Sequence, residues 1–190
     1  MHTVETSLAA PPMDLRADAR IPFPRETVFA AYRDDVVELV PYLTNVQAIE
    51  VKSRKDNGDL VEFVNEWRGG GEIPAAVRAF LSESMLSWTD YATWNAKSLS
   101  CDWRIETHAF TEAVRAVGHN RFLEDGVNQT ALEIRGTFAV DASKIRGVPR
   151  FLAGTVGRTV EDFMVGKIQS NLVETAKSLA LYLEAKAKKE

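Results

Sequence analysis

Cysteine and histidine are scarce in this sequence of 190 residues. Cys101 is the single cysteine, which excludes an intrachain disulfide framework and a metal site built from several cysteines. The three histidines stand at positions 2, 108 and 119, so the sequence has no pair with the four-residue spacing of zinc-binding histidines on a helix. We therefore expect no metal site and no cofactor.

Long apolar runs and an excess of basic residues are also missing. No uncharged run of eighteen apolar residues occurs, which argues against a membrane-spanning helix. The first twelve residues include Glu5 and lack an apolar core, so they do not resemble a signal peptide. We expect a flexible N-terminus at 1–12 and a cytoplasmic protein. The net charge of −4 argues against nucleic acid as a partner.

Alternating apolar and polar residues dominate the first three quarters of the chain. The segment 13–21 alternates throughout, which predicts a half-buried strand. Six further strands are predicted at 46–53, 60–67, 86–95, 98–107, 113–123 and 129–140. Asn57 and Gly58 supply a hairpin turn between the first two of these. Short connections of this kind are typical of an antiparallel meander.

Two segments have helical spacing instead. Residues 24–43 predict two short helices that meet near Asp34 and Asp35, and residues 149–188 predict one long helix with a buried face. The sequence therefore predicts an α+β fold with a single domain at 13–190. In it, a curved antiparallel sheet of about seven strands holds the long C-terminal helix on its concave face, and the two short helices follow the first strand.

Three passages resemble the START-like superfamily, also called SRPBCC, helix-grip or pollen-allergen-like proteins. They are RADARIPFPRETVFAAYRD, GVNQTALEIRGTFAV and the terminal helix, with Gly126 and Thr130 in the places of the family's glycine and threonine. The segment GEIPAAVRAFL is similar to the insert of the lipid- and sterol-transfer branches. The resemblance implies a cavity for an apolar ligand between sheet and helix, and it does not choose the ligand.

The side chains expected to line this cavity are mostly aromatic or aliphatic. From the strands they are Phe63, Asn65, Trp67, Trp88, Trp94, Trp103, Asn120, Phe122, Leu132, Ile134 and Phe138; from the helix they are Val156, Val160, Phe163 and Met164. Such side chains suit an adaptable apolar pocket. Burying a CH₂ group yields about 0.8 kcal/mol, so a lipid-like ligand needs no catalytic group to be held. The alternative is that these side chains pack together and leave no void.

Basic residues at Lys144, Arg146 and Arg150 stand near the expected mouth of the cavity. Each basic residue near an anionic membrane surface contributes about 1 kcal/mol, so a transient membrane contact is one interpretation. A plain basic loop is the other.

Three functions remain open. We favour non-catalytic binding, or transfer, of an apolar small molecule such as a lipid or sterol, and we predict no catalytic residue. The second is an enzyme similar to polyketide cyclases and dehydratases, which requires His119, Asn65 or Asn120 to face the interior. The third is a surface interaction module of the chaperone-activator type. Cys101 is interpreted as a small core hydrophobe.

Overall fold

Seven β-strands and a long C-terminal helix dominate the computed structural model, which describes residues 12–70, 82, 86–109, 111–144 and 153–189. The strands form one antiparallel sheet in the order β1-β7-β6-β5-β4-β3-β2. They are β1 (Met13–Ile21), β2 (Val46–Asn57), β3 (Leu60–Gly69), β4 (Ser87–Asn95), β5 (Ser100–Thr107), β6 (Val114–Glu124) and β7 (Thr130–Val140). The helices are α1 (Arg25–Asp34), α2 (Ala153–Ala187) and the short 3-10 helices η1 (Val36–Tyr42) and η3 (Ala142–Lys144).

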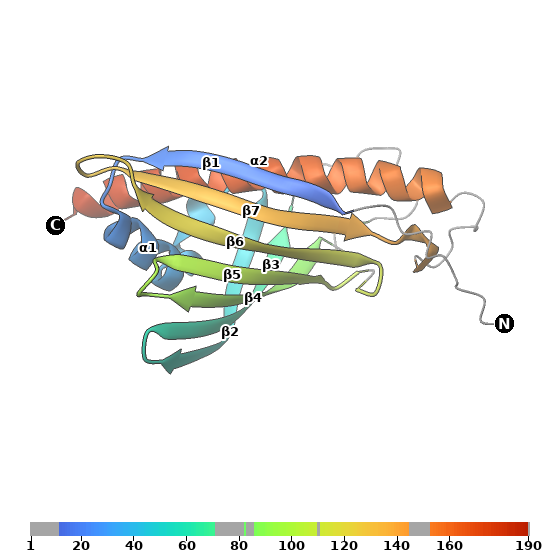
Figure 1. Cartoon of the computed structure of the whole chain (residues 1–190), viewed down its shortest axis with the longest axis horizontal. Coiled ribbons are helices and arrows are strands. Elements are labelled where there is room, and N and C mark those ends of the chain that lie inside the picture. The colour runs from blue at the N-terminus through green and yellow to red at the C-terminus, as the bar shows by residue number, and fades with distance from the viewer. Residues whose placement is uncertain (1–11, 71–81, 83–85, 110, 145–152, 190) are drawn as a thin grey trace.

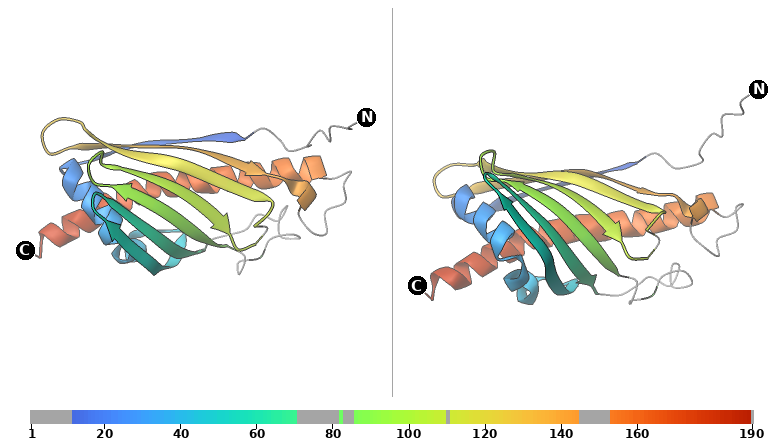
Figure 2. Two further views of the ribbon diagram at one scale, coloured as in Figure 1. Left: turned by 60° about the horizontal axis from the view of Figure 1, so that its bottom comes forward. Right: turned by 90° about the horizontal axis from the view of Figure 1, so that it is seen from below.

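The sheet is curved, and α2 runs along its inner side next to β1 and β7 (Figure 1). Helices α1 and η1 lie on the same side, beside the C-terminal half of α2 (Figure 2). We call the side of the sheet that faces these helices the concave face. The predicted α+β architecture is confirmed, with the difference that the second short helix is a 3-10 helix.

Local sequence explains how the fold begins. Leu15, Ala17 and Ile21 of β1 are buried on the concave face, and the polar residues between them are exposed or half-buried. This alternation is what a half-buried strand requires. Pro24 immediately precedes α1. A proline fits there because its missing N–H would have no partner at a helix start.

The β2–β3 hairpin turns one residue later than the predicted Asn57–Gly58 pair, because Asn57 belongs to β2. Asn57 pairs with Leu60, so Gly58 and Asp59 form the turn. Gly58 has a φ of 64°, a left-handed conformation that glycine adopts without steric cost.

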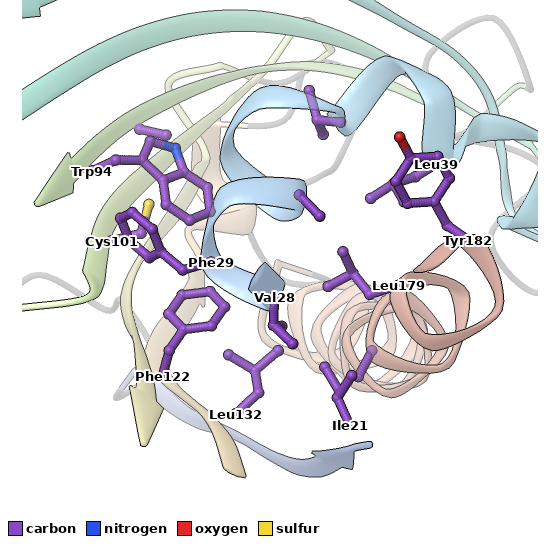
Figure 3. Packing of buried hydrophobic residues seen from close by; sticks show 14 of the residues in the cluster. Ile21, Val28, Phe29, Leu39, Trp94, Cys101, Phe122, Leu132, Leu179 and Tyr182 are labelled. Carbon is purple, nitrogen blue, oxygen red and sulfur yellow. The ribbon is translucent and has the colours of Figure 1, made fainter. Parts of the chain in front are cut away.

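The hydrophobic core extends beneath α1. Phe29 points from α1 toward Trp94 and Phe122 of the sheet, and its ring meets each of them edge-on at 5.4 Å between centroids (Figure 3). Each of these three side chains is at most 5% exposed. Edge-on aromatic pairs contribute about 0.5–1.5 kcal/mol beyond the burial of their area. Helix α1 therefore closes one end of the concave face.

The C-terminal half of α2 is fixed to the short helices by apolar and polar contacts. Leu179 is fully buried, and Ser178 Oγ lies 2.8 Å from the carbonyl oxygen of Tyr42. The hydroxyl of Tyr182 donates to a carboxylate oxygen of Asp35 at 2.8 Å. Across the described ranges, no helix is long and apolar enough to span a membrane.

Candidate functional site

Strand pairing arranges the concave face in rows that cross the sheet. The first row contains Trp67, Trp88 and Thr107. The second row contains Asn65, Asp90, Ile105 and Ala116. The third row contains Phe63, Ala92, Trp103 and Gly118, and the fourth contains Val61, Trp94, Cys101 and Asn120. Trp94 of the fourth row touches α1, so the first row lies farthest from that helix.

Burial decreases from the fourth row to the first. Trp94 is 5% exposed, whereas Trp67, Trp88 and Trp103 are half-buried. In the described part of the chain, α2 makes its main contacts with β1, β7 and η1 rather than with β3, β4 and β5. Trp67 and Trp88 stack on one another, with centroids 5.7 Å apart and planes 15° from parallel. The rows distant from α1 therefore retain aromatic surface that a small molecule can touch.

Two glycines allow the indole of Trp103 to pack directly against the backbone of the sheet. Gly118 and Gly136 are cross-strand partners on β6 and β7. A Cβ atom on Gly118 would overlap the indole, and one on Gly136 would lie 3.0 Å from its Cη2 atom. The indole Nε1 donates to Oδ1 of Asn120 at 2.8 Å. The tryptophan is thus held in one orientation by the lack of two side chains and by one hydrogen bond.

A carboxyl group lies among these aromatic side chains. Asp90 is half-buried, and the loss of surrounding water raises the pKa of its carboxyl to about 6. Its hydrogen-bonding partner is Asn65, whose Nδ2 lies at the long distance of 3.4 Å. Because Asp90 alternates with Trp88 and Ala92, its parity places it on the concave face, a signal that the sequence analysis missed.

Three buried polar atoms close to Asp90 have no hydrogen-bonding partner among the described residues. They are Oδ1 of Asn65, Nε1 of Trp67 and Oγ1 of Thr107. All three side chains belong to the first two rows. Leaving such an atom unpaired costs about 1–3 kcal/mol, and a bound molecule or ordered water is the usual compensation. The polar atoms and the accessible tryptophans therefore mark one region, which we call the Asp90 site.

The predicted lining residues of the sheet all face the concave side, but they differ in burial. Six of them are at most 5% exposed: Phe63, Trp94, Phe122, Leu132, Ile134 and Phe138. Asn65 and Asn120 are each 4% exposed. The half-buried tryptophans are the lining residues with accessible surface. Whether any of them contacts a ligand stays a prediction.

Other predicted residues lie outside the described parts. The side chains of Val156, Val160, Phe163 and Met164 on α2 are among them, as are the insert 71–81 and both arginines of the basic segment, Arg146 and Arg150. Lys144 is described, and its Nζ lies 3.7 Å from a carboxylate oxygen of Asp141.

Both described histidines face away from the concave side. His119 Nδ1 lies 2.6 Å from Oδ1 of Asp102, and His108 Nε2 lies 2.8 Å from the hydroxyl of Thr89, both on the outer face. A mechanism that places His108 or His119 in the interior is therefore excluded. Cys101 is 2% exposed, and burial raises the pKa of its thiol, as expected for a core residue.

Solved structures with the same fold cover nearly the whole chain. TTHA0849 from Thermus thermophilus is 20% identical, with a TM-score of 0.64 over 91% of this chain and 98% of that one. Zhui aromatase/cyclase from Streptomyces sp. R1128 is 15% identical, with a TM-score of 0.61 over 95% and 97%. Norcoclaurine synthase from Thalictrum flavum is 8% identical, with a TM-score of 0.60 over 96% and 92%.

These similarities establish that the chain has the helix-grip fold of START-like proteins. No family model matches the sequence, and no curated protein matches it. The solved structures of similar fold include aromatase/cyclases and a synthase as well as Ara h 8.0201, which has a TM-score of 0.53, so the shared fold does not choose a function.

Proposed function

We propose that this protein binds an apolar, ring-containing small molecule, of the size class of lipids and sterols, on the concave face at the Asp90 site. The observation that carries the proposal is the set of half-buried tryptophans, Trp67, Trp88 and Trp103, on strands β3, β4 and β5, which in the described part of the chain are not among the main contacts of α2. Each of these indoles offers contact area to a ligand.

The geometry of Trp103 supports the same proposal. The absence of side chains at Gly118 and Gly136 lets the indole sink toward the strands. Glycine in the middle of a strand lowers stability by about 0.5–1 kcal/mol relative to alanine, so the paired glycines need a compensating role. We propose that this role is to orient the indole so that its accessible part contacts the ligand.

The proposal is tested with N-phenyl-1-naphthylamine, a neutral apolar probe whose fluorescence rises when it leaves water. We expect saturable binding and displacement by the native ligand, recovered by organic extraction and identified by native mass spectrometry. Trp88→Ala removes one aromatic contact and should weaken probe binding about three- to tenfold. Tyr91→Ala, on the outer face of the same strand, is the matched control and should bind normally.

Two results would contradict this function. One is that the purified protein contains no extractable lipid or sterol and does not bind the probe. The other is equal binding by the wild type and by the Trp88→Ala variant, because the contact surface would then lie elsewhere.

A second candidate is an enzyme of the cyclase or dehydratase type, which the Asp90 carboxyl specifically favours. A group whose pKa lies near 6 exchanges protons efficiently near neutral pH. Burial raises the pKa of the Tyr32 phenol on α1, and the Asp90 charge raises it further, so a second proton-bearing group borders the site. Asp90 would take a proton from the carbon next to a substrate carbonyl and return it to a departing hydroxyl.

This candidate and simple binding are separated by the fate of the ligand. Incubating the extracted ligand, or an aromatic polyketone, with wild-type protein should yield a product that lacks one water molecule, and Asp90→Asn should retain binding and lose product formation. Recovery of every tested compound unchanged, at saturating protein, would leave binding as the function.

A further inference from the structure

We infer that the ligand of the Asp90 site carries a protonated amine, which the Asp90 carboxylate and the side-chain oxygen of Asn65 bind together. The inference rests on the proposed function, since it names the polar group of the molecule held on the concave face. It follows from the donors and acceptors that the two residues leave open.

The polar atoms that Asn65 and Asp90 leave open are acceptors and not donors. Their Cα atoms are direct partners across β3 and β4. The amide Nδ2 of Asn65 is directed at the carboxylate, so its Oδ1 is the atom that remains, and it is buried without a partner among the described residues. Asn65 is 4% exposed, so bulk water does not satisfy this oxygen.

A ligand group that satisfies both residues therefore supplies at least two hydrogen-bond donors at one point. A single hydroxyl has one hydrogen and can satisfy either the carboxylate or the amide oxygen, but not both. A primary ammonium has three N–H donors and can satisfy both acceptors at once. It also brings the positive charge that a carboxylate in apolar surroundings lacks.

No protein cation fills this role in the described part of the chain. The loss of surrounding water raises the pKa of the Asp90 carboxyl, and the hydrogen bond from the Asn65 amide lowers it. Tyr32 from α1 and Cys101 from β5 face it, and neither is a cation. Arg54 of the neighbouring β2 edge is committed elsewhere, with guanidinium contacts of 3.0 Å to Asp34 and 2.9 Å to Asp56.

Three indoles neighbour Asp90 on the concave face. Trp88 is two residues from Asp90 on β4, and Trp67 and Trp103 are its diagonal neighbours on β3 and β5. Diagonal neighbours on one face of a sheet are about 7–8 Å apart, within the reach of aromatic side chains. Indole faces attract cations, and tryptophan does so more strongly than tyrosine or phenylalanine.

The test compares two probes that differ in one group, 1-naphthylmethylamine and 1-naphthalenemethanol, by titration calorimetry at pH 7.5. The wild type should bind the amine at least about tenfold more tightly than the alcohol, as expected for hydrogen bonds to a charged group. Asp90→Asn should lose this preference and bind the alcohol within about twofold of the wild type. Asp102→Asn, the same change on the outer face of the adjacent strand, is the matched control and should keep the preference.

A second measurement needs no variant. The amine stays protonated between pH 7.5 and pH 5, whereas Asp90 takes up a proton as the pH falls through about 6. Amine affinity should therefore fall about tenfold over this range, and alcohol affinity should not change.

The outcomes separate this inference from the proposed function. Equal binding of both probes, unaffected by Asp90→Asn or by pH, would overturn the amine and leave ligand binding intact. Failure of the amine to bind, while N-phenyl-1-naphthylamine binds, would also overturn it. Failure of all three probes would overturn the proposed function together with the inference.

Discussion

Replacing Gly118 by alanine is the sharpest test of how the Trp103 indole packs against Gly118 and Gly136. A Cβ atom at this position would overlap Cζ2 of the indole and lie 2.6 Å from the carbonyl oxygen of Arg135, which is backbone and cannot rotate away. The indole must therefore leave the glycine pair, and its hydrogen bond to Asn120 must break.

The expected cost follows from these two contacts. Overpacking costs about 1–3 kcal/mol and a lost buried hydrogen bond about 0.5–1.5 kcal/mol, offset by about 0.5–1 kcal/mol from removing a glycine inside a strand. The net loss is about 0.5–4 kcal/mol, and its midpoint of about 2 kcal/mol corresponds to about 4–9 °C in Tm for a chain of this length. Urea unfolding and thermal unfolding, both followed by tryptophan fluorescence, measure it.

Gly166→Ala is the matched control, because nothing lies within 4 Å of a Cβ atom on this exposed residue of α2. Here alanine should stabilise the protein by up to about 1 kcal/mol. The two glycine-to-alanine changes are thus expected to have opposite signs. If Gly118→Ala has the same urea midpoint of unfolding as the wild type, the described packing of Trp103 against Gly118 is wrong.

The other predictions concern buried polar groups. The pKa of Asp90 is about 6 in the folded protein against an ordinary 3.8, so the folded state holds a proton that the unfolded chain releases from about pH 4 upward. The free energy of unfolding of the wild type should therefore fall as pH rises from 4 to 6. That of Asp90→Asn should be higher than the wild-type value by up to about 3 kcal/mol at pH 7.5, but not at pH 3.5. The same difference between the two urea midpoints at both pH values would refute this. Tyr182→Phe removes a hydroxyl that lies 2.8 Å from carboxylate oxygens of both Asp35 and Glu38. It should lower the free energy of unfolding, measured by urea titration, by about 1–2 kcal/mol. An unchanged urea midpoint would contradict the anchoring of α2 by this hydroxyl. Asn120→Leu leaves the Trp103 indole N–H without its acceptor and should cost about 1–3 kcal/mol with a shifted tryptophan emission, and a silent variant would show that this bond is not formed.

Local pattern was sufficient to predict most of the fold. The alternation from Met13 to Ile21 predicts β1 with the bounds that the structure has, and the Asn57–Gly58 pair predicts the β2–β3 turn. Each depends on neighbours in sequence, where strand periodicity and turn chemistry act directly. The order of strands and helices follows from adding such segments together.

The Asp90 site was predicted only in part. Its tryptophans and Asn65 were identified, because apolar side chains at alternate positions indicate an inward face. Asp90 has the same parity, but a carboxylate is costly to bury, so the pattern alone favours placing it in solvent.

The packing of Trp103 against two glycines could not be predicted from local sequence. It requires Gly118 to lie opposite Gly136, a pairing of residues eighteen positions apart that strand register decides.

The central claim is that ligands bind beside Trp67, Trp88 and Trp103. The chain has four tryptophans, and the fourth, Trp94, is buried against α1. Replacing all four by 5-fluorotryptophan gives one fluorine resonance for each, which Trp→Phe variants assign. Saturation with N-phenyl-1-naphthylamine should shift the resonances of Trp67, Trp88 and Trp103 and leave that of Trp94 in place. Unchanged spectra, or a shift confined to Trp94, would contradict the account.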